Sequence, residues 1–232
     1  MSHLLDKYIA PFLQEIKGQY PKASTILEIS CKGNITTRKQ IAQQWLSEGI
    51  PFAFKECPYI YEAIRCYISE KLKVNVKNIG VVGSARIGQS LKPNQAGKPF
   101  DINSDLDLFV VSETLFELMV SDFNLWNSSF LSGMVIPRNN NERIFWSDNS
   151  ARIPKNIQRG FINSDKVPTL HSYKNISQIN NTLSLLSNNL KKYEQLKIKP
   201  QKISIRCYKS WESFFKQVSL SLDVKEFNVY KE

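Results

Sequence analysis

IGVVGSARIGQSLKPNQAGKPFDINSDLDLFVV, residues 79–111, is the part of this 232-residue chain that decides its fold. Two apolar runs open and close the stretch, and we expect each to form a strand. Asp105 and Asp107 lie two positions apart at the second run, so their carboxylates project from the same face, whereas Leu106 points into a core. Two carboxylates on one face repel each other unless a cation lies between them. Mg²⁺, held by one or two carboxylates together with the phosphates of a substrate, is the usual cation at such a place.

The first apolar run, residues 79–82, ends at the dipeptide Gly83-Ser84. A glycine turn followed by a hydroxyl group offers backbone N–H groups and a side-chain donor to a phosphate. Arg86, two residues further on, either offsets charge on a leaving pyrophosphate or lies on the protein surface. The stretch therefore predicts a phosphate-binding turn beside an acidic strand.

This pattern resembles the DNA polymerase β-like nucleotidyltransferase superfamily, whose signature is an apolar strand, a Gly-Ser turn, an Asp-x-Asp on the next strand and a third carboxylate on a later strand. The matching residues are Gly83, Ser84, Asp105 and Asp107, and the resemblance is best over residues 59–111. It implies an enzyme that moves a nucleoside monophosphate from a nucleoside triphosphate such as ATP to an acceptor. Two metal ions, Mg²⁺ or Mn²⁺, stabilise the attacking and leaving oxygens in such a reaction.

The resemblance leaves the acceptor open among a nucleic acid, a protein hydroxyl and another nucleotide. Small stand-alone members of the superfamily serve as toxins, antitoxins or antiviral signalling enzymes, which implies a toxin–antitoxin or antiviral setting and a cognate protein partner. The alternative is a catalytically degenerate fold that keeps its pocket and binds a nucleotide, a nucleic acid or a protein.

Three residues compete for the position of the third carboxylate. We favour Asp165, because the segment FINSDKVP resembles the ending of a strand in the cyclic-oligonucleotide synthases of the superfamily. Asn163 has the apolar neighbours of a strand residue but carries no charge. Asp148 lies among polar residues that we expect to form a loop. An acid close to Asp105 and Asp107 favours the enzyme, and a neutral residue favours the binding module.

The formal charge of +10, from 31 Lys and Arg against 21 Asp and Glu, favours polyanionic partners such as nucleoside triphosphates, RNA or DNA. Basic side chains gather around Pro200, where they form either a solvated helix face or a path for a nucleic-acid backbone. These residues are Lys191, Lys192, Lys197, Lys199, Lys202, Arg206 and Lys209.

Cysteine usage and hydropathy predict a soluble cytoplasmic protein. The four cysteines are scattered and the two histidines lack zinc-ligand spacing, so we expect reduced, mostly buried thiols. The first twenty residues do not have the pattern of a signal peptide. No apolar run approaches the roughly 18 residues that span a bilayer, so we expect no membrane contact.

Periodicity predicts an α+β protein, with a helical N-terminal cap at residues 1–57 and a helical C-terminal segment at 171–232 packed on a core at 58–170. The resemblance implies that this core is a polymerase β-like nucleotidyltransferase core with a small mixed sheet. We expect helices at 5–16, 37–49, 58–72, 113–126 and 179–193, and another from Tyr208 to Val218. We expect strands at 79–82, 106–111, 134–137 and 160–163. The remainder of 128–168 is predicted to be irregular. The helix expected at 37–49 either packs in the N-terminal cap or binds DNA as part of a helix-turn-helix, and we favour packing. Residues 92–99 are predicted to form an exposed loop, which is a lid, a contact for the acceptor or an inert insertion.

Overall fold

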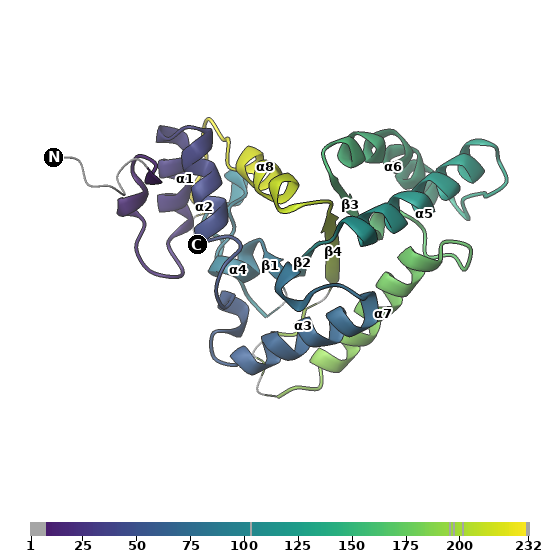
Figure 1. Ribbon diagram of the computed structural model, residues 1–232, viewed down its shortest axis with the longest axis horizontal. Helices are drawn as coiled ribbons and strands as arrows, with labels where there is room; N and C mark the ends of the chain where they lie inside the picture. The colour runs from purple at the N-terminus through teal and green to yellow at the C-terminus, as the bar shows by residue number, and fades with distance from the viewer. Residues whose placement is uncertain (1–7, 103, 195, 197, 201, 231–232) are drawn as a thin grey trace.

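The computed structural model describes residues 8–102, 104–194, 196, 198–200 and 202–230. Its α-helices are α1 (Ala23–Lys32), α2 (Ile35–Gln44), α3 (Pro58–Leu72), α4 (Ser84–Ile87), α5 (Glu113–Leu131), α6 (Asn140–Gln158), α7 (Lys174–Leu190) and α8 (Trp211–Ser221). Its strands are β1 (Ile79–Val82), β2 (Leu106–Val111), β3 (Phe161–Asn163) and β4 (Ile203–Tyr208). The sheet lies at the centre of the molecule, with α3 and α7 below it, α8 above it and the α5–α6 pair to one side (Figure 1).

Within the described residues the strands form one mixed sheet of four in the order β1-β2-β4-β3. β1 and β2 are antiparallel neighbours with Val82 opposite Asp107, and β2 and β4 are parallel with Asp107 opposite Ser204. β3 is antiparallel to β4, with Asn163 opposite Arg206. The predicted α+β architecture, with a small mixed sheet in which the two apolar runs are neighbours, is therefore confirmed.

The main hydrophobic core lies between one face of the sheet and helices α3, α5 and α7. Alternate residues of β2, namely Leu106, Leu108 and Val110, are at most 1% exposed there. α3 begins with Pro58 in its first turn, where the missing backbone N–H would have no helical partner in any case. It ends before Lys73, which adopts a left-handed conformation with φ 56°. α3 therefore has the predicted bounds.

The opposite face of the sheet is covered by α8 at the end where β2 and β4 finish. α8 begins two residues after β4, so it folds back over the second half of that strand. Phe109 of β2 packs against Trp211 and Phe214 of α8, with ring centroids 5.8 and 4.4 Å apart. We call this part of the β2–β4 pair the closed end; its strand residues under α8 are Phe109, Val111 and Tyr208. Cys207, at the same level of β4, lies on the other face, in the main core. The open end is made of Asp105, Asp107, Lys202 and Ser204, which are exposed or half-buried.

A second hydrophobic cluster joins the N-terminal helices α1 and α2 to the C-terminal helix α8. Ile26, Ile41 and Leu222 from these three parts of the chain are at most 2% exposed. α2 begins after Asn34, whose side chain accepts hydrogen bonds from the first backbone N–H groups of the helix. The helix therefore starts slightly before the predicted position, and its buried residues show that it packs in the cap.

The predicted exposed loop at 92–99 is anchored to the C-terminal tail. Ala96 is fully buried, and its carbonyl accepts a hydrogen bond of 2.7 Å from the Tyr230 N–H. The Asn228 N–H donates to the Pro93 carbonyl at 2.8 Å. These backbone contacts fit an insertion that supports the cap better than they fit a mobile lid.

The structure does not support the helix predicted at 5–16. The described part of this range contains the 3₁₀ turn Leu13–Glu15 and no α-helix, and residues 5–7 lie outside the described residues. Pro11 provides the physical reason, because a proline inside a helix removes one hydrogen bond and clashes with the preceding turn. Phe12 follows it with a left-handed φ of 69°.

Residues 128–168 are more regular than predicted. The strand expected at 134–137 is absent from the described structure, where these residues form part of the connection between α5 and α6. The polar residues that follow form α6, a helix of 19 residues. Asn139 starts it by accepting a hydrogen bond from the Glu142 N–H at 2.9 Å. Its buried residues are sparse, so the sequence shows little of the three-and-four spacing that predicts a helix.

The C-terminal segment contributes a strand to the interior of the sheet, where we expected helix through Tyr208. Ile203, Ile205 and Cys207 alternate with Ser204 and Arg206, and this period of two belongs to a strand. The spacing of the aromatic residues that follow belongs to α8 and does not extend back across Tyr208. The 171–232 segment is therefore part of the sheet as well as a helical layer.

Hydropathy and cysteine placement can be compared with the predictions directly. Within the described residues no helix combines the length and the apolar character needed to cross a bilayer. The cysteines are free thiols, with Cys31 and Cys66 exposed and Cys57 and Cys207 buried. Burial raises the pKa of the Cys207 thiol to about 12.

Candidate functional site

Asp107 and the Gly83 turn lie side by side at the open end. Asp107 points outward from β2, and its Oδ1 accepts a hydrogen bond of 2.6 Å from the Ser204 hydroxyl. A Cβ placed on Gly83 would lie 3.8 Å from Asp107 Oδ2, so this oxygen faces the turn. Gly83 has φ 72°, which favours glycine, and the turn opens directly into Ser84 and α4. The predicted phosphate turn and one predicted metal ligand are therefore adjacent.

Asp105 precedes β2 by one residue, as the strand expected at 106–111 implies. The strand begins at Leu106, whose N–H donates to the Lys202 carbonyl at 2.9 Å. The approach to Asp105 is held by a local turn in which the Ser104 hydroxyl donates to Asp101 Oδ1 at 3.0 Å. Asp105 is exposed, as is Asp107.

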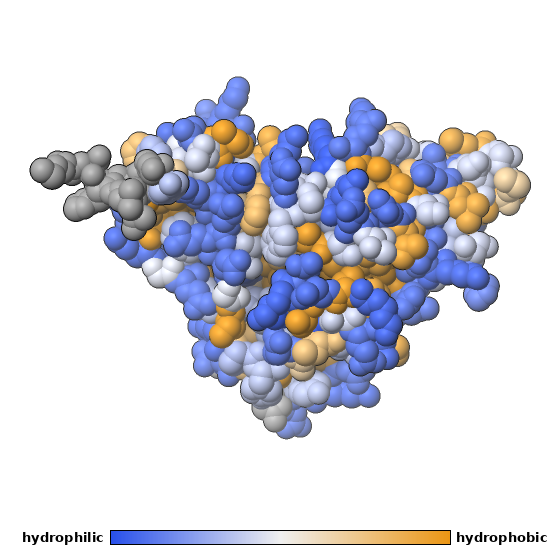
Figure 2. Space-filling view, viewed as in Figure 1, coloured by the Kyte–Doolittle hydropathy of each residue, from blue (hydrophilic) through white to orange (hydrophobic). Residues whose placement is uncertain are grey.

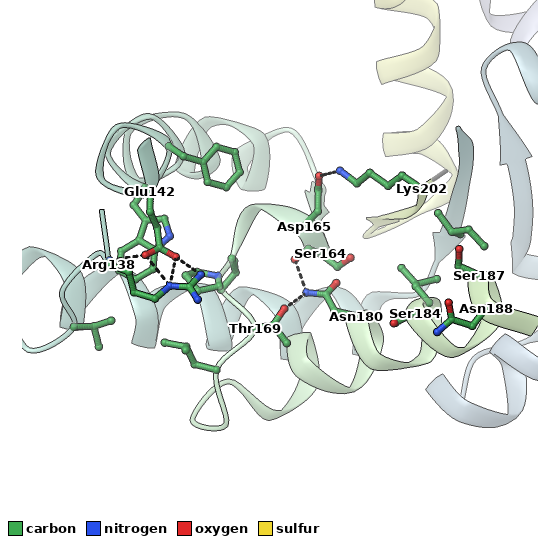
Figure 3. Close-up of a pocket in the computed structure, with 18 of the residues that line it drawn as sticks. Arg138, Glu142, Ser164, Asp165, Thr169, Asn180, Ser184, Ser187, Asn188 and Lys202 are labelled. Atoms are coloured by element: carbon green, nitrogen blue, oxygen red, sulfur yellow. Dashed lines mark hydrogen bonds and ion pairs between the residues drawn. The ribbon is translucent and has the colours of Figure 1, made fainter. Parts of the chain in front are cut away.

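Lys202 links the carboxylates of this region. Its Nζ lies 2.8 Å from Asp165 Oδ2 (Figure 3). The hydrogen bond that Lys202 donates to Asp165 raises the pKa of Lys202, and the negative charges of Asp165, Asp105 and Asp107 act in the same direction. Asp165 also lies 3.8 Å from the Lys166 ammonium, in the 3₁₀ turn Ser164–Lys166 that follows β3. Lys202 therefore pairs with the favoured third carboxylate, and the first two act on it through their charge alone.

The residue that stands beside Asp107 on the next strand is Ser204, which the sequence did not suggest as a site residue. The sequence pattern that could have revealed Ser204 is the alternation of polar and apolar residues from Lys202 onward, because such alternation identifies the outward-facing positions of a strand. The other two candidates lie elsewhere. Asn163 accepts a hydrogen bond of 3.0 Å from Arg206 Nε, and Asp148 is on α6 in an ion pair of 2.7 Å with Arg152.

The donor set at the open end fits one divalent ion. Asp105 and Asp107 supply two exposed carboxylates, and Mg²⁺ is commonly held by one or two carboxylates with water and substrate phosphates completing the shell. Among the described residues there is no group of three acidic, histidine or cysteine side chains placed to hold a metal. The two-metal site with a third protein carboxylate stays a prediction.

Arg86 occupies an unexpected position. It lies on α4 and is 2% exposed, and its Nη1 donates to the Ile50 carbonyl at 2.8 Å. Burial lowers the pKa of the guanidinium, an effect that nearby Tyr61 and Tyr20 partly offset. The side chain is therefore not a surface residue, and its described contact joins the phosphate turn to the N-terminal cap. A role toward a phosphate stays a prediction.

The basic cluster does not form one continuous helix face. Lys202 and Arg206 belong to the β4 segment and bond to Asp165 and Asn163. Lys209 forms an ion pair of 3.3 Å with Glu113. Lys191, Lys192 and Lys199 are exposed, whereas Lys197 lies outside the described residues. Binding of RNA or DNA by this cluster stays a prediction.

Comparison of the chain with protein-family models, with curated proteins and with solved structures gave no significant match.

Proposed function

We propose that this protein is a nucleotidyltransferase that transfers a nucleoside monophosphate from a nucleoside triphosphate to an acceptor. The observation that carries the proposal is the position of Asp107 beside the Gly83 turn, opposite Val82 on the neighbouring strand, at the uncovered end of the sheet. A phosphate-binding turn beside a pair of exposed carboxylates can hold a triphosphate together with a divalent cation. The first apolar run positions the turn, and the second positions the carboxylates.

In this proposal the open end orients the triphosphate for in-line attack. The backbone at Gly83 and the Ser84 hydroxyl bind the β- and γ-phosphates. Asp105 and Asp107 would hold Mg²⁺ or Mn²⁺, which supplies positive charge to the oxygens around the α-phosphorus. Ser204 donates to Asp107 and fixes the direction of that carboxylate.

The transfer needs a base and a leaving group. The acceptor oxygen forms a bond to the α-phosphorus while the bond to the pyrophosphate oxygen breaks, and the acceptor proton passes to a carboxylate. We assign this proton to Asp165. The Lys202 ammonium adds positive charge at the same end, which reduces the need for a second metal ion.

A specific observation favours the second candidate, a non-catalytic nucleotide-, nucleic-acid- or protein-binding module. The residue opposite Asp107 on β4 is the neutral Ser204, where an acid would strengthen the metal site. Such a module would bind a triphosphate in the same way and transfer nothing. A cytoplasmic role in toxin–antitoxin or antiviral defence is compatible with either candidate and stays a proposal.

The deciding experiment incubates the protein with each α-³²P-labelled triphosphate and Mg²⁺ or Mn²⁺, using total RNA, single nucleotides and the protein itself as acceptors. We expect label transfer that Asp107→Asn and Asp105→Asn each reduce by at least 100-fold. Asp148→Asn is the matched control, because this acid is on α6 in its own ion pair, and it should transfer at the wild-type rate. Equal transfer by Asp107→Asn would refute the assignment.

Ser204→Asp separates the enzyme from the module. If wild type binds triphosphate with Mg²⁺ but transfers no label, the module is correct. A gain of transfer in Ser204→Asp would then show that one missing carboxylate accounts for the inactivity. If wild type is already active, transfer does not need the additional carboxylate. We then expect Ser204→Asp only to bind Mg²⁺ more tightly than wild type does.

A further inference from the structure

A cavity of about 770 Å³ opens next to the candidate site, between α6, the segment 164–170 and α7. Its lining includes Asp165 and Lys202, so its rim meets the open end of the sheet. Figure 2 shows hydrophobic side chains gathered between the α5–α6 pair and α7, framed by hydrophilic ones. The volume is within the range of roughly 300–1,000 Å³ that is usual for small-molecule sites.

The two walls of the cavity differ in chemistry. The α6 side presents Phe145 and Trp146, joined by apolar residues of the neighbouring loops such as Val167. The Arg138–Glu142 ion pair also lines this side, and the Lys166 ammonium lies 5.1 Å from the centroid of the Phe145 ring. The α7 side presents a stripe of neutral amide and hydroxyl side chains, of which Ser184 and Ser187 are one helical turn apart. A ligand that fits both walls has a flat apolar ring on one side and several hydrogen-bonding groups on the other.

Buried polar atoms at the back of the cavity are without partners. Ser164 is fully buried, and its Oγ has no hydrogen-bond partner among the described residues. Oδ1 of Asp165 is likewise buried and unpaired within the described structure, although Oδ2 binds Lys202. Asn180 is already occupied, because its Nδ2 donates to the Ser164 carbonyl at 3.3 Å and to Thr169 Oγ1 at 2.8 Å (Figure 3). A buried polar atom without a hydrogen-bond partner costs free energy, so we expect a hydrogen-bond donor on a bound ligand to reach these two atoms.

We propose that this cavity binds a nucleoside monophosphate, and that this nucleotide is the acceptor of the transfer proposed above. The base lies against Phe145 and Trp146, the ribose hydroxyls face the polar stripe of α7, and the phosphate lies at the rim near Lys191 and Lys202. The acceptor role rests on the proposed function, whereas the binding does not.

In this arrangement Asp165 can accept the proton of the acceptor hydroxyl. The phosphate turn is at β1 and the cavity is on the far side of β4, so the open end of the β2–β4 pair lies between the two ligands. A ribose hydroxyl that donates to the unpaired Asp165 Oδ1 passes its proton there. Its oxygen then bonds to the α-phosphorus, and pyrophosphate leaves.

The first test measures binding of each nucleoside monophosphate by isothermal titration calorimetry without divalent metal, with ribose 5-phosphate and the free base as partial ligands. We expect at least one monophosphate to bind, and to bind at least tenfold more tightly than either part. Failure of all four monophosphates to bind at millimolar concentration would overturn the proposal. Asp107→Asn should bind the monophosphate as wild type does, so failure here is distinguishable from failure of the proposed function.

A pair of substitutions on one helix locates the ligand. Ser184 and Asn181 are both exposed on α7, but Ser184 lines the cavity and Asn181 does not. Ser184→Phe should weaken monophosphate binding at least tenfold, and Asn181→Phe should leave it unchanged. Equal effects would place the ligand elsewhere.

A second pair keeps the test decisive if Ser184→Phe does not fold. Ser164→Ala removes a hydroxyl that has no described partner, so its thermal stability should equal or exceed that of wild type while binding weakens about tenfold.

A charge reversal at the rim tests the position of the phosphate. Lys191→Glu should weaken binding of the monophosphate and leave binding of the nucleoside unchanged. Lys192→Glu, which is exposed outside the lining, should change neither affinity. Unchanged binding in both Ser164→Ala and Lys191→Glu would refute the site.

Discussion

The two ends of the β2–β4 pair are built from the same strands and differ in nearly every other respect. At the closed end, Phe109 and Tyr208 are at most 2% exposed and pack against α8. At the open end, Asp107 and Ser204 face outward without a covering helix and bond to each other. The difference arises because α8 begins just after β4 and returns over its second half. One sheet therefore provides a packed base and a polar edge, and we expect stability to depend on the first and ligand binding on the second.

The largest effect expected at the closed end comes from Phe214→Ala. Phe214 is fully buried, and its ring centroid lies 4.4 Å from that of Phe109 and 5.0 Å from that of Tyr208. Emptying this space should lower the free energy of unfolding by about 3–5 kcal/mol, measured by urea denaturation. Leu220→Ala is the control on the same helix, since Leu220 is 46% exposed, and it should cost much less. Similar losses in both variants would mean that α8 does not pack as described.

Gly80→Ala tests how closely β1 approaches the closed end. A Cβ on Gly80 would overlap Phe109 Cε1, and the ring is held by its neighbours on α8. We expect a loss of about 1–3 kcal/mol in the free energy of unfolding. Phe109→Leu in the same chain should relieve the overlap, so the double variant should lose less than the sum of the two single losses. Strict additivity would argue against this contact.

Cys207, on the main-core face of β4 at the closed end, makes the stability of this end depend on pH. Burial raises the pKa of its thiol from 9.0 to about 12, so the unfolded chain loses this proton at lower pH than the folded one. The stability that depends on the protonated thiol is complete below pH 9 and is lost as the pH rises toward 12. Between pH 8 and pH 10 wild type should lose roughly 1 kcal/mol more than Cys207→Ala does. Parallel pH profiles for the two proteins would show that the thiol is not buried.

The smallest effect on stability is expected at the open end. Asp107→Asn removes one of two neighbouring carboxylates and keeps an oxygen for Ser204, so the free energy of unfolding should stay within about 0.5 kcal/mol of wild type. The same variant should lose metal-dependent triphosphate binding, measured by titration with and without Mg²⁺. A large loss of stability would make Asp107 a structural residue and remove the distinction between the two ends.

Prediction from sequence succeeded where one local pattern was sufficient. The spacing of Ile60, Ile64 and Ile68 predicts the bounds of α3, and short apolar runs predict β1, β2 and β3 to within one residue. It failed for α6, whose apolar face is too sparse to produce a period. It also failed at Tyr208, because the alternation that marks β4 runs directly into the spacing of α8.

The candidate site shows the same division. Asp105, Asp107 and the Gly83 turn are recognisable because their order along the chain resembles a known signature. Ser204 is separated from Asp107 by 97 positions in the sequence, and its role depends on a parallel strand pairing. Asp165 was proposed from its neighbours, but its bond to Lys202 required the fold to bring β3 and β4 together.

Local patterns were sufficient to predict the class of fold, the two strands of the acidic stretch and a set of candidate site residues, because each follows from side chains close together in the chain. The tertiary structure decided which end of the sheet is open, that Ser204 faces Asp107, that Arg86 is buried and that a cavity adjoins Asp165. These features depend on strand register and on where α8 and α7 pack. Pairings between distant segments are selected by the burial of the whole core, and no local pattern records them.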